Sequence, residues 1–285
     1  MKVTLVYPRL NRVDCGSGSI HMPLGILYLA SYLREHGHQI SVIDATFMDS
    51  WETFEENLKK ESPDIIGISF SSPLAEYGFK AAGIAKKCFP DRLVITGGPH
   101  SLVDMSGTIC KDFIDMVVIG EGEKTLLEIV EACSQDKGFH HIKGICFKDG
   151  KKLVKTEDKT DFIENLDDLP MPALDLLDIE KYIQETGRVT FITSRGCPGK
   201  CYYCQPTIDK MFGRKIRGHS PERIIEEIKI VAERYYDKNK NFLFEFVDDT
   251  FCYSKKRTLE FCELIKKHAL TNLPYWVISR IDHCK

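Results

Sequence analysis

Short apolar runs alternate with longer amphipathic segments along the first half of the chain. Apolar and β-branched runs that end at proline, glycine or polar residues predict strands at residues 2–7, 39–43, 64–70, 93–96 and 116–119. Residue spacing and start and stop signals predict helices between them, at residues 23–36, 51–61, 74–88 and 124–133. Nearly continuous apolar strands that alternate with helices are typical of a doubly wound parallel sheet covered on both faces.

The second half resumes the alternation after a connecting region. Strands are predicted at residues 189–194, 242–247 and 275–279, with a helix from Ser220 to about residue 235. Residues 142–156 predict a β-hairpin around Asp149-Gly150, and the proline-broken, acidic run 166–178 predicts a linker. We therefore expect an α/β domain at 1–138, a hairpin and linker at 139–187, and a second α/β domain at 188–285.

Composition excludes several classes of protein. The chain has 285 residues, of which 43% are hydrophobic and 28% charged, which is typical of a globular protein with one or two cores. Its net charge of −3 gives no reason to expect nucleic acid or an anionic membrane surface as a partner. No apolar run is long enough to span a bilayer, and the N-terminus lacks a signal-peptide pattern. We expect a cytoplasmic protein.

Cysteine is the unusual component, with 11 residues in the chain. Eight are scattered, and we expect them to be small buried residues: Cys15, Cys88, Cys110, Cys133, Cys146, Cys252, Cys262 and Cys284. The other three, Cys197, Cys201 and Cys204, share a short loop opened by Pro198 and Gly199. In a reducing compartment, such close spacing indicates a metal before disulfides, because three thiolates can converge on one side of a metal centre.

The number of ligands decides which metal this loop would hold. A distant fourth ligand, His219 or Cys252, would complete a structural zinc site. Without one, three thiolates on a four-iron cluster leave one iron open for chemistry. Chance clustering is disfavoured because Gly199 and Lys200 mark a loop, and a redox Cys-x-x-Cys pair would leave Cys197 without a role.

Loops of small residues follow three strands of the first domain, at residues 69–72, 97–100 and 120–123. Open parallel sheets bind ligands beyond the carboxyl ends of their strands, and small residues let a large ligand approach the backbone. The alternative is that these glycines merely end strands. Residues 120–125 lack the glycine that a phosphate-binding loop needs before its lysine, and no Gly-x-Gly-x-x-Gly follows the first strand. An ordinary ATP or NAD domain is therefore not predicted.

The cysteine spacing resembles a known signature. Cys197-x-x-x-Cys201-x-Tyr203-Cys204 is similar to the motif of the radical S-adenosylmethionine (SAM) superfamily. Over essentially the whole chain, PLGILYLASYL, GISFSS, TGGPH, GEGE, LPMPALDLLD and SRGCPGKCYYC resemble its B12-binding-domain subgroup. The resemblance implies a Rossmann-like, cobalamin-binding sheet followed by a (β/α) radical SAM barrel. It also implies that the three cysteines hold a [4Fe-4S] cluster, that SAM chelates the fourth iron, and that Tyr203 lies against the adenine.

The same resemblance suggests roles for polar residues at strand ends. Asp248 and Asp249, after the strand at 242–247, would pair with the amino group of SAM; the alternative is that they cap the helix beginning near Lys255. Arg280 would bind the SAM carboxylate as a bidentate fork, or lie at the surface.

Cobalamin would be held through backbone and small side chains. The residues implied are Ser69, Ser71, Gly97, Gly98, His100, Gly120 and Gly122. The Asp-x-His-x-x-Gly motif, whose histidine binds cobalt in many cobalamin domains, is absent. We therefore expect His100 to be a hydrogen-bonding residue, with cobalt ligation as the alternative.

Only three barrel strands are predicted, where the family has six, so we expect a barrel truncated within this chain or completed by a partner. The resemblance implies reductive SAM cleavage for methylation or rearrangement of an unactivated carbon. It implies a flavodoxin or ferredoxin as electron donor and a small-molecule or lipid-like substrate. The alternative is a non-catalytic corrinoid- or iron–sulfur-binding module that needs another chain.

Overall fold

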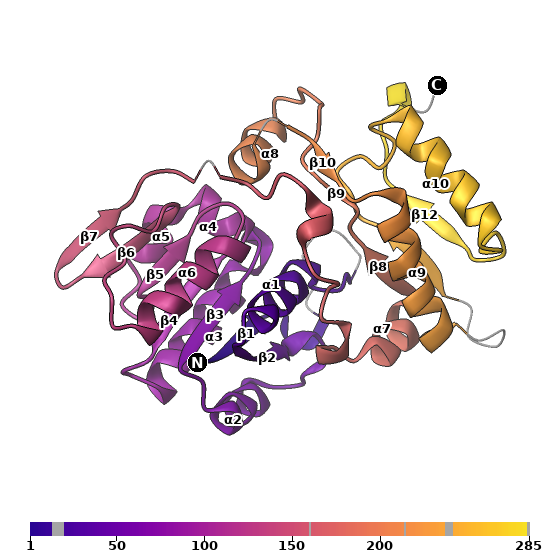
Figure 1. Ribbon diagram of the computed structural model, residues 1–285. Helices are drawn as coiled ribbons and strands as arrows, with labels where there is room; N and C mark the ends of the chain where they lie inside the picture. Colours follow the sequence, from indigo (N-terminus) through magenta and orange to yellow (C-terminus); the bar gives the residue numbers. More distant parts are fainter. Residues whose placement is uncertain (13–19, 160, 214, 237–241, 284–285) are drawn as a thin grey trace. The chain divides into compact units, whose positions relative to one another are not determined.

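The computed structural model describes residues 1–12, 20–159, 161–213, 215–236 and 242–283 (Figure 1). The chain divides into two compact units. Unit 1 comprises residues 1–19 and 25–162, and unit 2 comprises residues 20–24 and 163–285. Within the described ranges, no helix has the length and apolar character needed to cross a membrane.

Unit 1 is built on a seven-stranded sheet with the order β2-β1-β3-β4-β5-β6-β7. The strands are β1 (Lys2–Tyr7), β2 (Gln39–Asp44), β3 (Ile65–Ser69), β4 (Leu93–Gly97), β5 (Met116–Val118), β6 (Ile145–Asp149) and β7 (Lys152–Lys155). The first five are parallel, whereas β6 and β7 are antiparallel and extend the sheet beyond β5. All five parallel strands lie where the sequence predicts them.

The helices of unit 1 cover both faces of this sheet. They are α1 (Leu24–Glu35), α2 (Trp51–Glu61), α3 (Ala75–Cys88), α4 (Pro99–Val103), α5 (Met105–Ile109) and α6 (Glu123–Ser134). Right-handed crossovers place α1 on one face and α2 and α3 on the other, because the strand order reverses direction after β2. The reversal lies between β1 and β3, which is the switch point where such sheets bind ligands.

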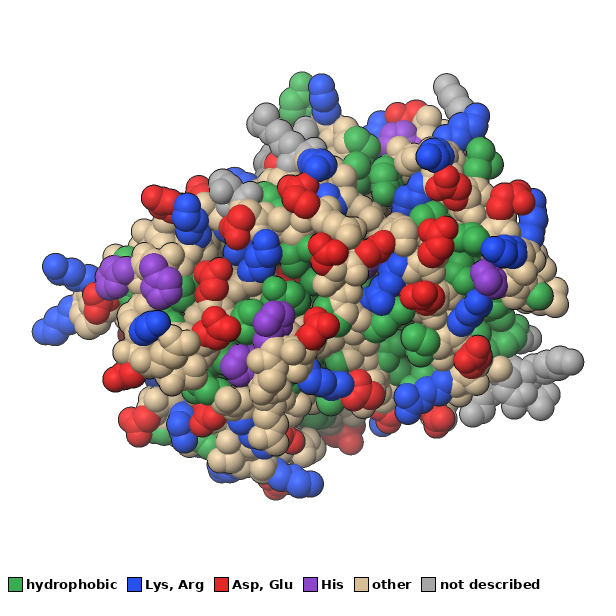
Figure 2. All heavy atoms as spheres, viewed as in Figure 1, with side chains coloured by type: hydrophobic (Ala, Val, Ile, Leu, Met, Phe, Trp, Pro, Cys, Tyr) green, Lys and Arg blue, Asp and Glu red, His purple; other side chains and the backbone are tan. Residues whose placement is uncertain are grey.

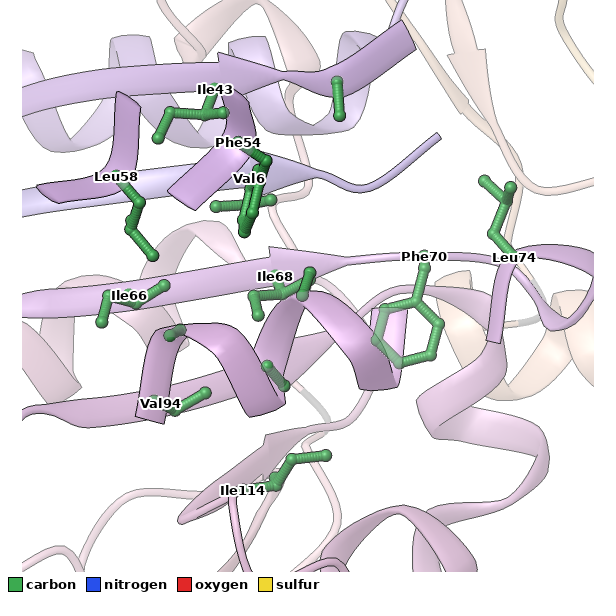
Figure 3. Packing of buried hydrophobic residues seen from close by; sticks show 14 of the residues in the cluster. Val6, Ile43, Phe54, Leu58, Ile66, Ile68, Phe70, Leu74, Val94 and Ile114 are labelled. Carbon is green, nitrogen blue, oxygen red and sulfur yellow. The ribbon is translucent and has the colours of Figure 1, made fainter. Parts of the chain in front are cut away.

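The core on the α2 and α3 face is continuous. Val6, Ile68 and Val94 point from neighbouring strands toward Phe54 and Leu58 of α2 and the alanines of α3 (Figure 3). Phe70, just beyond β3, extends this core to the carboxyl edge of the sheet and is 1% exposed. A rigid core therefore reaches the base of the loops that the sequence singled out.

Unit 2 contains a three-stranded parallel sheet of order β12-β11-β8 and a short antiparallel ribbon, β9-β10. The strands are β8 (Arg188–Phe191), β9 (Ser194–Arg195), β10 (Arg217–Gly218), β11 (Leu243–Phe246) and β12 (Tyr275–Val277). The helices are α7 (Ile179–Thr186), α8 (Gln205–Phe212), α9 (Pro221–Tyr235) and α10 (Lys255–Lys267). Phe191, Phe244 and Phe246 stack across the sheet, and Phe246 also contacts Phe261 of α10.

The opposite face of this sheet carries polar side chains. Glu245 of β11 is buried, and its carboxylate accepts from Arg188 at 2.8 Å and lies 3.2 Å from His21 Nδ1. The backbone N–H of Met22 donates to the hydroxyl of Thr190 at 3.3 Å. Residues 20–24 thus belong to unit 2, although the residues on either side of them belong to unit 1.

Several sequence predictions are corrected by the structure. The hairpin predicted at 142–156 is present, but it belongs to the sheet of unit 1 rather than to a separate connecting region, because β6 pairs with the edge of β5. The two aspartates do not cap α10: the cap is Ser254, whose hydroxyl accepts from the N–H of Arg257. The scattered cysteines are mostly not buried as expected: Cys146 is buried, Cys88, Cys133 and Cys252 are partly buried, and Cys110 and Cys262 are exposed. Cys15 and Cys284 lie outside the described residues.

Candidate functional site

The carboxyl ends of β8, β11 and β12 bring together three groups that are far apart in the sequence. Because the strands are parallel, their carboxyl ends share one edge of the sheet. The cysteine loop, here residues 196–204, follows β8 and β9; Asp248 and Asp249 follow β11; and Arg280 follows β12. This is the edge where active sites of β/α folds gather.

Contacts link the cysteine loop to Arg280. The Nη1 of Arg280 lies 3.5 Å from the Sγ of Cys201, and the N–H of Gly199 donates to the Sγ of Cys197 at 3.4 Å. Cys204 ends the loop at the N-terminus of α8, a helix that is not predicted from the sequence. Across the described ranges, no three His, Cys, Asp or Glu side chains are close enough together to form a metal-binding group. The thiols thus share one loop without forming a closed ligand set.

The electrostatics of the loop reflect several acidic groups at close quarters. Partial burial, and then the negative charges of Asp249, Cys197 and Cys201, raise the pKa of the Cys204 thiol above its ordinary value. The pKa of Asp249 is raised by desolvation and by Asp248, while the N–H of Gly196 donates to it and opposes the rise. A cation bound by the thiols would relieve this repulsion, which makes the donor set chemically suited to a metal centre.

Asp248 is held inside the protein. Asp248 is 1% exposed, and its Oδ1 accepts from the N–H of Thr193 at 2.9 Å and from the hydroxyl of Ser194 at 2.6 Å. Its Oδ2 lies 3.1 Å from the Thr193 hydroxyl, which donates to it. Burial raises the pKa of Asp248, and these hydrogen bonds oppose the rise. Asp249, in contrast, is at the surface beside the cysteine loop.

Arg280 and Tyr203 differ in how they are constrained. The guanidinium of Arg280 makes a bidentate pair with Asp282, at 3.0 and 2.8 Å. A ligand carboxylate would have to share or displace that partner. Tyr203 is 92% exposed and Tyr202 98% exposed, so neither ring is packed.

His219 and Cys252, the two expected candidates for a fourth zinc ligand, have other contacts. His219 is buried, with its Nδ1 3.1 Å from Asp167, and burial lowers its pKa to about 4. The N–H of Cys252 donates to the hydroxyl of Ser279 at 3.3 Å. In the part of the chain that the structure describes, neither residue joins the three thiols in a ligand group.

In unit 1, the predicted cobalamin residues lie at the carboxyl ends of β3, β4 and β5. Gly98 has φ +86°, and a Cβ there would lie 2.7 Å from the Ser69 hydroxyl and 2.9 Å from the carbonyl of Phe70. Two backbone segments therefore meet closely at this position. Gly97 ends β4, while Gly120 follows β5 with φ +87°.

Gly122 and Ser71 precede helices at the same edge. Gly122 caps α6, and a Cβ there would lie 2.9 Å from the side chain of Leu29 on α1. Ser71 precedes a 3₁₀ turn at Ser72–Leu74 and makes no side-chain capping hydrogen bond.

His100 and its neighbours present buried polar atoms. The Nδ1 of His100 lies 3.1 Å from the Ser72 hydroxyl, and its ring packs against Phe70 and Phe79. Its Nε2, like the hydroxyls of Thr96 and Ser101, is buried without a hydrogen-bond partner among the described residues. Buried polar atoms without partners are costly, so these three suit a ligand with donors and acceptors of its own. Sequence reasoning missed Thr96 and Ser101; Thr96 is the first residue of the TGGPH segment and Ser101 directly follows it, which is the one signal available.

The fold and the site together define an α/β protein with a doubly wound domain and a thiol-bearing parallel sheet. Residues 16–130 match the sequence model of the B12 binding domain family. The chain is 36% identical over 288 residues to an uncharacterized methyltransferase, PH0819, of Pyrococcus horikoshii, covering 99% of this chain and 60% of that protein. It is 29% identical over 280 residues to the anaerobic magnesium-protoporphyrin IX monomethyl ester cyclase of Rubrivivax gelatinosus, covering 94% of this chain and 48% of that protein.

The fold is shared with solved structures. The radical SAM methyltransferase TsrM from Kitasatospora setae matches with a TM-score of 0.79 at 20% identity, covering 98% of this chain and 54% of that chain. The α/β fold predicted from the sequence is therefore confirmed. This chain spans about half to three-fifths of the length of the proteins named here.

Proposed function

We propose that the chain is the cofactor-binding part of a cobalamin-dependent radical SAM enzyme. Cys197, Cys201 and Cys204 hold a [4Fe-4S] cluster, and unit 1 holds cobalamin. The reaction takes place at an unactivated carbon, as methyl transfer or as a rearrangement that forms or alters a ring. The two relatives described above, a methyltransferase and a cyclase, support both outcomes.

One observation carries the proposal: the carboxyl ends of three parallel strands gather the cysteine loop, Asp249 and Arg280 at one edge. An amino acid group such as that of SAM has one cationic and one anionic end. Asp249 would accept from the amino group, and the guanidinium of Arg280 would donate to the carboxylate. The three thiolates leave one iron of a four-iron cluster free for a further ligand.

Arg280 and Asp249 would position SAM at this site. When bound, the cluster supplies the electron that cleaves SAM, and cobalamin supplies a carrier for a methyl group. The ion pair with Asp282 keeps the guanidinium of Arg280 oriented while no ligand is bound. To bind the SAM carboxylate, Arg280 must release Asp282 or share its donors between the two carboxylates. The N–H of Gly196, at the start of the cysteine loop, lowers the pKa of Asp249 and so favours the charged carboxylate that an amino group would need.

Unit 1 would receive cobalamin at the loops after β3, β4 and β5. The close approach at Gly98 brings backbone to the surface of the ligand, and the free Nε2 of His100 and the hydroxyls of Thr96 and Ser101 offer polar contacts. Since the Nδ1 of His100 already pairs with Ser72, we propose that His100 is a hydrogen-bonding residue of this site.

Anaerobic reconstitution with iron and sulfide tests the proposal. The wild-type chain should turn brown and hold about four irons, with the absorbance of an iron–sulfur cluster. Cys201→Ala should lose the iron and the colour, whereas the control Cys262→Ala, which changes an exposed cysteine on α10, should keep both. A colourless wild-type protein that holds zinc or no metal would contradict the proposal.

A further inference from the structure

The strand end before the cysteine loop is fixed by a buried carboxylate. Asp248 accepts from the N–H of Thr193 at 2.9 Å and from the hydroxyl of Ser194 at 2.6 Å. These two residues lie directly before Arg195, Gly196 and the first cysteine. Ser194 is also the first residue of β9, which pairs with Gly218 of β10.

Arg257 binds a backbone carbonyl at the same strand end. Its Nη2 donates to the Thr193 carbonyl at 3.0 Å and contacts the Thr193 hydroxyl at 2.9 Å. Its Nε donates to the carbonyl of His219 at 3.0 Å, on the segment that follows β10. Thr193 therefore has its N–H, carbonyl and hydroxyl all bound by two side chains from β11's end and α10.

The packing around Arg257 leaves little room for movement. Its guanidinium lies over the ring of Tyr253 at 5.1 Å and that of Phe251 at 5.5 Å. A Cβ at Gly218 would lie within 3.3 Å of the Nε of Arg257 and closer still to the Tyr253 hydroxyl. Thr193, Ser194, Asp248 and Arg257 are each at most 8% exposed. We call these four residues the clamp.

We propose that Asp248 and Arg257 are positioning residues that set the direction of the cysteine loop, and that Asp248 is not a SAM contact. This inference rests on the proposed function. Residues 196–201 have no helix or strand hydrogen bonding of their own, so their direction depends on where the preceding residues are anchored. Metal sites require their ligands within about 0.5 Å of the productive geometry, and buried hydrogen bonds behind the ligands supply that precision.

The burial of Asp248 separates the two roles. With 1% of the residue exposed and both oxygens accepting hydrogen bonds inside the protein, it has no free face for a ligand. Asp249, the next residue, is exposed at the same end of β11, so it can serve the ligand while Asp248 serves the loop.

The test compares Asp248→Asn, Ser194→Ala and their double variant with the full wild-type chain. The matched control is Glu245→Gln, which changes another buried carboxylate, within β11 itself, that is bound to Arg188 and His21. After anaerobic reconstitution, iron release to a chelator is timed and the electron paramagnetic resonance spectrum of the reduced cluster is recorded without SAM. Hydrogen exchange of the Thr193 amide is measured in the iron-free chains.

The clamp predicts that Asp248→Asn and Ser194→Ala each speed iron release by about tenfold, as loss of a residue behind a metal ligand does. The increase in the rate of iron release in the double variant should be much smaller than the product of the two single-variant increases, because both substitutions remove the same anchor. Thr193 exchange should be faster in Asp248→Asn, and Glu245→Gln should match wild type throughout. Ser194→Ala, which removes one hydroxyl, keeps the test decisive if Asp248→Asn folds poorly.

Two outcomes overturn the inference, and they are distinguishable. If the wild type holds its cluster and both variants release iron at the wild-type rate, the clamp is wrong and the proposed function stands. If the wild type holds no cluster, the proposed function fails and the positioning role fails with it.

Discussion

Gly98→Ala should strongly lower the stability of unit 1. At φ +86° and ψ −175°, Gly98 has a backbone conformation that almost only glycine adopts, and an alanine there costs about 1–3 kcal/mol in strain. The added Cβ would also lie 2.9 Å from the carbonyl oxygen and 3.1 Å from the nitrogen of Phe70, which are backbone atoms and cannot turn aside. Overpacking of this kind costs about 1–3 kcal/mol. We expect a loss of about 2–6 kcal/mol in the free energy of unfolding.

Two other glycines provide controls. Gly150 has φ +59° but open space around its Cβ position, so Gly150→Ala should cost only about 1–2 kcal/mol of conformational strain. Gly25 lies in α1 with open space and an ordinary φ, so Gly25→Ala should stabilise by about 0.5–1 kcal/mol. The three substitutions add the same methyl group, so their differences measure backbone conformation and contact alone.

The assay is urea unfolding followed by tryptophan fluorescence. The chain has two tryptophans, so a Trp276→Phe background leaves Trp51 of unit 1 as the sole reporter. Trp51 contacts the rings of Phe54 and Tyr77, and its emission should change when the core of unit 1 opens. If Gly98→Ala loses no more stability than Gly150→Ala, Gly98 and Phe70 do not approach each other as closely as the structure indicates. The proposal that this close approach brings backbone to cobalamin would then be wrong as well.

Two further predictions concern unit 2. Burial raises the pKa of Glu227 to about 7, so its neutral form stabilises the fold below the ordinary value of 4.5 and that contribution is lost as the pH rises through 7. Glu227→Gln should therefore be more stable than wild type at pH 8, by at most about 3 kcal/mol, and as stable as wild type near pH 4. Thermal unfolding across this pH range measures the difference. Equal stability at pH 8 would show that the folded protein does not raise the pKa of Glu227. The second prediction concerns the Kd of SAM for the reconstituted chain. Asp282→Asn should lower this Kd by no more than about fivefold, because Arg280 no longer pairs with Asp282, and Arg280→Leu should raise it by about tenfold. An unchanged Kd in both variants would show that Arg280 does not contact SAM.

The fold of unit 1 was predictable because its strands are apolar on both faces and its helices have clear boundaries. The run 51–61, for example, has its cap at Ser50, whose hydroxyl accepts from the N–H of Thr53, and α2 spans the predicted residues. The short helices α4 and α5 were not predictable, since five residues give no readable periodicity. Likewise, the hairpin's turn was evident from Asp149-Gly150, but its pairing with β5 is a tertiary contact.

The site was predictable where the residue type itself carries the chemistry. Cysteine spacing and strand-end positions pointed to the cysteine loop, Asp248, Asp249 and Arg280, and parallel pairing explains why these lie at one edge of the sheet. Arg257 could not be predicted, because it lies in the run Lys255-Lys256-Arg257, which reads as an exposed basic start of a helix. Only the fold shows that one of these three cations points inward, where it binds the Thr193 carbonyl.

Residues 20–24 have a consequence for how the chain folds during synthesis. Met22 and Thr190 are 168 residues apart, and His21 and Glu245 are 224 apart, yet both pairs lie within unit 2. At about 5–20 residues per second, a ribosome completes their partners roughly ten seconds or more after this segment emerges. Until then the segment cannot dock, and neither unit is a single continuous stretch of the gene. A cut at the boundary near residue 162 would therefore not yield two intact halves, because the second half would lack His21 and Met22.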